Sequence, residues 1–173
     1  MNDLSGENEG KTLVITNETN FDTIEEQHDG LYDIVKISNM NIDKEFAYQL
    51  CQKSLNFDLI RLEIDGCTIS PKILDKILDP SILDLIITNC ELHIQDLCDI
   101  IGAFNGSGNH NVDLSKSKIY WNEGLGKLDR VGPPPMYEYY KVGNLCFNGS
   151  EITNGDKNRL KNKCRGWDVK FVN

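Results

Sequence analysis

The sequence predicts an α/β solenoid, in which short strands alternate with helices and stack into a curved parallel sheet with the helices on its convex side. Three observations predict this fold. One apolar pattern recurs along the chain, the centre of each copy alternates apolar and polar residues, and apolar residues at helical spacing follow each copy. We expect about six to seven short strands.

The recurring pattern is apolar-x-x-apolar-x-apolar-x-x-Cys/Met-x-apolar. Three segments match it without gaps, and two further segments match it less completely. The three are residues 32–42, 59–69 and 82–92, and the two are residues 109–119 and 142–152. Short edge copies surround Leu13 and Val169. The central alternation places both apolar side chains of each copy on one side of a strand.

The expected strands are anchored by one apolar residue each. These anchors are Leu13, Val35, Leu62, Leu85, Val112, Leu145 and Val169, and they are separated by 22 to 33 residues. A single strand and helix cannot enclose a core, whereas stacked neighbours can.

Helical spacing of apolar residues follows four of the strands. The residues are Phe46 and Leu50; Ile73, Leu74, Ile77 and Leu78; Leu97, Ile100, Ile101 and Phe104; and Leu160 and Cys164. Pro71 fits the first turn of the second helix, where its missing N–H costs nothing.

Two strings carry a resemblance to a known family. They are Leu62-x-Ile64-x-x-Cys67-x-Ile69 and Leu85-x-Ile87-x-x-Cys90-x-Leu92, the second followed by Leu97 and Cys98. The chain resembles the leucine-rich-repeat family, in its cysteine-containing, ribonuclease-inhibitor-like branch, most closely over residues 32–119. The resemblance implies a rigid surface that binds a protein partner.

The chain is expected to form one domain over residues 11–173, after a disordered acidic segment at residues 1–10. An irregular insertion at about 120–141 contains Gly-Pro-Pro-Pro, followed by a tyrosine-rich segment. Tyr137, Tyr139 and Tyr140 could anchor a partner, or they could cover the edge of the sheet.

The polar positions of the strands should form columns on the concave face, with neighbours ~5 Å apart. The first column holds Thr12, Ile34, Arg61, Asp84, Asn111, Asn144 and Asp168. The second holds Val14, Lys36, Glu63, Ile86, Asp113, Cys146 and Lys170. The third holds Thr16, Ser38, Asp65, Thr88, Ser115, Asn148 and Val172.

Four acids gather at the centre of these columns, relieved by Arg61 alone. They are Glu63, Asp65, Asp84 and Asp113. Such a cluster favours a cationic partner, although a solvated polar face would explain it as well. The candidate partner-binding residues are Lys36, Arg61, Glu63, Asp65, Asp84, Ile86, Asp113, Tyr137, Tyr139 and Tyr140.

The net charge of −9 and pI of about 4.8 argue against nucleic-acid and membrane binding. An open sheet offers no burial to shift the pKa of a carboxyl group, so we expect no catalytic residues, and we expect neither metal ligands nor a cofactor. The absence of a leader-like N-terminus indicates the cytoplasm, where the six cysteines should be reduced.

The cysteines and histidines are expected to have structural or surface positions. Cys67 and Cys90 should fill adjacent buried slots, Cys51, Cys98 and Cys164 should lie in helix cores, and Cys146 should face outward. His28, His93 and His110 are expected at the surface.

These features favour a non-enzymatic module that binds a basic protein through its concave face. An inhibitor or immunity-type protein is the form that the resemblance implies. The alternative is a scaffold or adaptor subunit, with the basic C-terminal segment or the Tyr-rich loop as a second contact. The chain could be a monomer or an end-to-end dimer.

Overall fold

A computed structural model describes residues 10–24, 32–53, 59–104, 109–120, 143–147, 154–164 and 166–171. Its central feature is a parallel sheet of seven strands whose order follows the chain. The strands are β1 (Thr12–Ile15), β2 (Ile34–Ser38), β4 (Arg61–Asp65), β6 (Asp84–Thr88), β8 (His110–Asp113), β10 (Gly143–Cys146) and β11 (Trp167–Lys170). The predicted parallel sheet of six to seven strands is confirmed.

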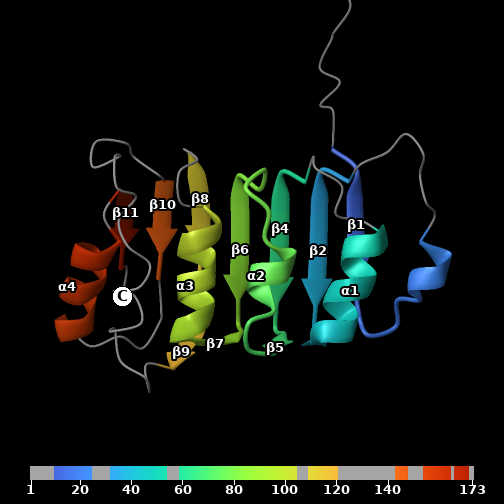
Figure 1. The fold of residues 1–173 in the computed structure, drawn as a ribbon, viewed down its shortest axis with the longest axis horizontal. Coiled ribbons are helices and arrows are strands. Elements are labelled where there is room, and N and C mark those ends of the chain that lie inside the picture. Colours follow the sequence, from blue (N-terminus) through green and yellow to red (C-terminus); the bar gives the residue numbers. More distant parts are fainter. Residues whose placement is uncertain are drawn as a thin grey trace, which may run out of the picture.

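Helices accompany this main sheet on one side, as Figure 1 shows. They are α1 (Lys44–Lys53), α2 (Leu74–Ile77), α3 (Ile94–Ala103) and α4 (Asn154–Lys163), with a short 3₁₀ helix, η1 (Phe21–Thr23), that packs against α1. In Figure 1, α1, α2 and α3 lie in front of the strands and α4 lies at the β11 end. The helices expected from apolar spacing are therefore present in the described part of the chain.

Local signals explain where two helices begin. The Asp43 carboxylate accepts the backbone N–H of Phe46 at 3.0 Å and thereby caps α1. At the start of α3, the Asp96 carboxylate accepts the backbone N–H of His93 at 2.7 Å. The first-turn prediction for Pro71 is wrong, because a turn containing Lys72 at φ 63° separates it from α2, which begins at Leu74.

The core lies between the main sheet and the helices. The strand anchors Val35, Leu62, Leu85, Val112 and Leu145 are all fully buried there. They lie side by side in the sheet, since the register pairs each anchor with the next. The helices contribute the fully buried residues Leu50, Leu74 and Leu97. Removing this apolar surface from water is the main stabilisation of such a stack.

A second parallel sheet, which the sequence pattern did not predict, follows the carboxyl ends of four main strands. It consists of β3 (Asn41–Ile42), β5 (Thr68–Ile69), β7 (Glu91–His93) and β9 (Lys118–Tyr120). The turn between each main strand and its short partner contains a residue with positive φ, between 53° and 62°. These residues are Asn39, Gly66, Asn89 and Lys116. Glycine and asparagine tolerate this left-handed conformation best.

The described cysteines are all free. As predicted, Cys67 and Cys90 are buried in neighbouring slots and Cys98 is buried on α3; Cys164 is also buried, directly after the end of α4. Cys51 corrects the prediction of a core position, because it is exposed on α1 and its thiol lies 3.5 Å from the Lys76 carbonyl.

Candidate functional site

The side chains between the buried anchors occupy the face of the main sheet that points away from the helices. We call this the open face. The register aligns Thr12, Ile34, Arg61, Asp84, Asn111, Asn144 and Asp168 in one column, and Val14, Lys36, Glu63, Ile86, Asp113, Cys146 and Lys170 in the next. Both columns match the sequence prediction. Of the third, the register pairs Ser38, Asp65 and Thr88, and Asn148 and Val172 lie outside the described residues.

Glu63, near the middle of the open face, is held by two basic side chains. Its carboxylate lies 3.1 Å from the Lys36 ammonium and 2.7 Å from Nε of Arg61. The expectation that Arg61 alone relieves the acids is therefore wrong: Lys36 occupies the neighbouring position of the same column and reaches the same carboxylate. Because these side chains are partly exposed, the pairs contribute little stability and mainly fix the side chains in place.

Asp65 is satisfied by uncharged groups from the next strand and turn. Its Oδ1 atom accepts hydrogen bonds from the Thr88 hydroxyl at 2.7 Å and from the Asn89 amide at 2.6 Å. These two bonds, more than the nearby Lys116, hold the pKa of the Asp65 carboxyl below its ordinary value. Asp65 thus also serves the turn that joins β6 to β7.

Asp113 and Asp84, like Asp65, form no ion pair among the described residues. Asp113 accepts the backbone N–H of Ser115 at 2.9 Å and also the Ser115 hydroxyl. That hydroxyl lies 4.0 Å from the Cys146 thiol, which is partly exposed on this face as predicted. Asp84 stands between Arg61 and Asn111 in its column.

The open face combines this excess of acid with apolar side chains. Along the two paired columns and Asp65 there are five carboxylates and three basic groups. Ile86 lies between Glu63 and Asp113 in the second column and is partly buried. The arrangement can accept a partner that offers both cations and apolar contact.

The described residues contain no group of three or more His, Cys, Asp or Glu side chains arranged to hold a metal ion. In the same part of the chain, no helix is both long and apolar enough to cross a membrane.

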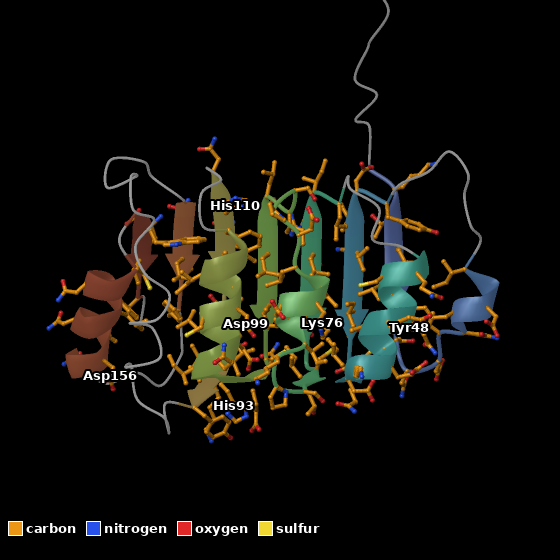
Figure 2. The ribbon with its side chains drawn as sticks, in the orientation of Figure 1. Tyr48, Lys76, His93, Asp99, His110 and Asp156 are labelled. Carbon is orange, nitrogen blue, oxygen red and sulfur yellow. The ribbon has the colours of Figure 1, made fainter. Side chains whose placement is uncertain are left out.

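His110 corrects the expectation of surface histidines. It is 1% exposed, its Nδ1 atom lies 2.8 Å from the Ile82 carbonyl oxygen, and its ring stacks on Phe104 with centroids 4.5 Å apart. His93 is exposed and stacks on Tyr120. Figure 2 places the two histidines at opposite ends of the strands, so they do not form one site. His28 lies outside the described residues.

Two aspartates on α3 were not singled out from the sequence. Asp96 is fully buried, and burial raises the pKa of its carboxyl; Asp99 is partly buried with a pKa raised for the same main reason. Each keeps one carboxylate oxygen, Oδ1 of Asp96 and Oδ2 of Asp99, that is buried without a hydrogen-bond partner. The sequence feature that could have identified them is the presence of two acidic residues within an otherwise apolar helical stretch.

Asp99 and Lys76 lie on the helix-covered side, as Figure 2 shows, and not on the open face. Tyr137, Tyr139 and Tyr140 lie outside the described residues, as does most of the insertion at 120–141. Comparisons of the chain with protein-family models, with curated proteins and with solved structures each find no match.

Proposed function

We propose that this chain is a leucine-rich-repeat solenoid with a curved sheet, and that it acts as a non-enzymatic module binding a basic protein through its open face. One observation carries the proposal: two columns of side chains cross all seven strands in register on the face that the helices leave uncovered. Stacked repeats commonly bind partners through such a continuous surface.

The existing contacts of the acids indicate which of them would bind the partner. Glu63 already has Lys36 and Arg61 as partners, and Asp65 is hydrogen-bonded within the fold. Asp84 and Asp113 are the acids that a lysine or arginine of the partner would neutralise at the least cost to existing contacts. Ile86, which lies between Glu63 and Asp113 in the second column, would supply the apolar centre.

An inhibitor or immunity-type role is the form of this function that the repeat pattern favours by resemblance. We place the protein in the cytoplasm, where the free state of its cysteines is the expected one.

The experiment is affinity capture with the whole chain as bait, followed by titration calorimetry with the purified partner. We expect a basic partner, a one-to-one complex and affinity that falls as salt rises. Asp84→Lys should weaken binding by about tenfold or more. The matched control is Asp75→Lys, which makes the same charge change on the exposed surface of α2. Equal effects of the two variants, or an acidic partner, would overturn the assignment.

The adaptor alternative is favoured by a separate observation. Tyr48 on α1 is 59% exposed, and Ile60 and Leu83, at the amino ends of β4 and β6, are each 45% exposed. None of the three belongs to the open-face columns. If they contact a second protein, two partners should bind the chain at once, and Leu83→Asp should release one while Asp84→Lys releases the other.

A further inference from the structure

The two ends of the main sheet differ in how their edges are protected. At one end, β11 carries Asp168 and Lys170, both about half exposed, and α4 packs against it. At the other end, β1 has the sequence Thr-Leu-Val-Ile, without charge or proline, and Val14 is 56% exposed. Charged residues and covering elements are the usual protection against edge-to-edge pairing, and β1 contains no charged residue.

The hydrogen-bond pattern shows which backbone groups of β1 point outward. The backbone N–H of Ile34 donates to the Lys11 carbonyl at 3.1 Å, so Lys11 faces β2. Because the direction alternates along a strand, Leu13 also faces β2, while the N–H and C=O groups of Thr12 and Val14 point away from the sheet. The edge ends at Thr16, whose N–H donates to the Thr19 hydroxyl at 2.9 Å.

We propose that β1 pairs antiparallel with β1 of a second copy of this chain, about a two-fold axis that passes beside Leu13. In this register Thr12 of each copy lies opposite Val14 of the other, and both pairs exchange two hydrogen bonds. The outward groups of one edge are therefore satisfied by the same groups of the other. This self-complementarity is what a two-fold interface requires, and it favours a second copy as the occupant.

The side chains and charges of the edge fit this pairing. The axis runs perpendicular to the sheet, so the two open faces lie on the same side, and Val14 of each copy packs beside Thr12 of the other. Each Lys11 lies opposite Ile15, which separates the two lysines by about 14 Å, beyond the screening length at physiological salt. The two copies together would present one doubled open face.

The interface is small, and each copy carries a net charge of −9, so the pairing should be weak and should strengthen as salt rises. This dependence is opposite to that expected for the complex with a basic partner. The dimer also does not depend on the proposed function, because it needs no open-face acid.

Sedimentation velocity over about a thousandfold range of concentration tests the pairing. We expect a monomer–dimer equilibrium whose dissociation constant rises by about tenfold or more in Val14→Lys. Thr68→Lys is the matched control, since it places the same charge at an exposed β-branched position of β5, away from the edge, and it should leave the equilibrium unchanged. A monomer at every concentration, or equal effects of the two variants, would refute the proposal.

Cross-linking tests the register itself. In a background with Cys51→Ser and Cys146→Ser, Leu13→Cys places two thiols across the axis within disulfide range. Added diamide, which takes up the two electrons and two protons, should link the copies. Val14→Cys is the control, because its two thiols would lie about 8 Å apart at the backbone. Linkage through residue 14 in preference to residue 13 counts against this register. Slow hydrogen exchange of the Thr12 and Val14 amides in dilute monomer would show that the chain covers its own edge, and would also overturn the pairing.

Discussion

The Sγ atom of Cys90 accepts a hydrogen bond from the backbone N–H of Cys67 at 3.4 Å, in the turn that follows β4. The next slot repeats the arrangement, since the Ser117 hydroxyl oxygen accepts the N–H of Cys90 at 3.2 Å. The Cys90 thiol also donates to the Thr88 carbonyl at 3.1 Å, and the Ser117 hydroxyl to the Ile87 carbonyl at 2.9 Å. The slot therefore requires a small buried side chain that both accepts and donates.

Cys90→Ser should consequently be better tolerated than Cys90→Ala. Serine keeps an acceptor for the Cys67 N–H, as Ser117 does for Cys90, whereas alanine leaves that buried N–H unsatisfied. We expect alanine to lower the free energy of unfolding by about 1–3 kcal/mol and serine to lower it less. Urea unfolding followed by circular dichroism measures both. If alanine proves as stable as serine, the sulfur contributes no useful hydrogen bond.

The raised pKa values of two buried thiols lead us to expect a loss of stability at alkaline pH. Burial raises the pKa of Cys90 from 9.0 to about 11, and that of Cys164 to about 12. The unfolded chain therefore loses these protons first. The stabilisation is complete below pH 9 and is lost as pH rises through the folded values, by about 1.4 kcal/mol per pH unit for each thiol.

Urea unfolding in reducing buffer, from pH about 8 to about 11, measures this slope. Cys164→Ala should flatten it, while other titrating groups contribute equally to both proteins. Parallel stability profiles for the two proteins would be inconsistent with a perturbed Cys164 thiol.

The alternating strands and the columns of the open face could be predicted because both depend on local periodicity. Register in a parallel stack follows once the buried anchors are aligned, as with Leu62 and Leu85. The second sheet was missed because its strands have only two or three residues and carry one buried residue each, such as Ile69, too little for a periodic signal.

The burial and contacts of the residues that were wrongly predicted depend on neighbours that are distant in the sequence. His110 occupies the same register position as the exposed Leu83, but Phe104 stacks on its ring. The partners of the acids were also invisible in the sequence, because the long Lys36 side chain reaches a neighbouring strand and Asn89 reaches back from a turn to Asp65. Backbone register could be predicted; the rotamers of exposed side chains could not.

Asp96→Asn should stabilise the protein at neutral pH. The variant keeps an oxygen that can accept the His93 N–H and removes a buried charge whose second oxygen has no partner. Because burial raises the folded pKa, the stability that protonation supplies is present below the ordinary value of 3.8 and is lost as pH rises through the folded pKa. The gain from asparagine should be about 1 kcal/mol near pH 7 and should shrink on acidification.

Thermal or urea unfolding at several pH values measures the difference between the two proteins. The control is Asp168→Asn at an exposed position, which should change stability by less than about 0.5 kcal/mol. A marked loss of stability in Asp96→Asn at neutral pH would mean that the charged carboxylate is needed to cap α3.

Two glycine-to-alanine substitutions should have opposite effects. A Cβ atom at Gly143 would lie 1.8 Å from the backbone carbonyl oxygen of His110, the neighbouring residue in β8. Because displacing backbone atoms is energetically costly, Gly143→Ala should lower the free energy of unfolding by about 3 kcal/mol or more and separate β10 from β8. At Gly102, within α3, a Cβ would meet nothing within 4 Å, and alanine should stabilise the helix by about 0.5–1 kcal/mol.

Urea unfolding of both variants provides the measurement, and each serves as the other's control for the loss of a glycine. If Gly143→Ala were neutral, β10 could not lie as close to His110 as its register requires. The continuous open face would then end at β8, so the substitution also tests whether Asn144 and Cys146 belong to the columns that the proposed partner would contact.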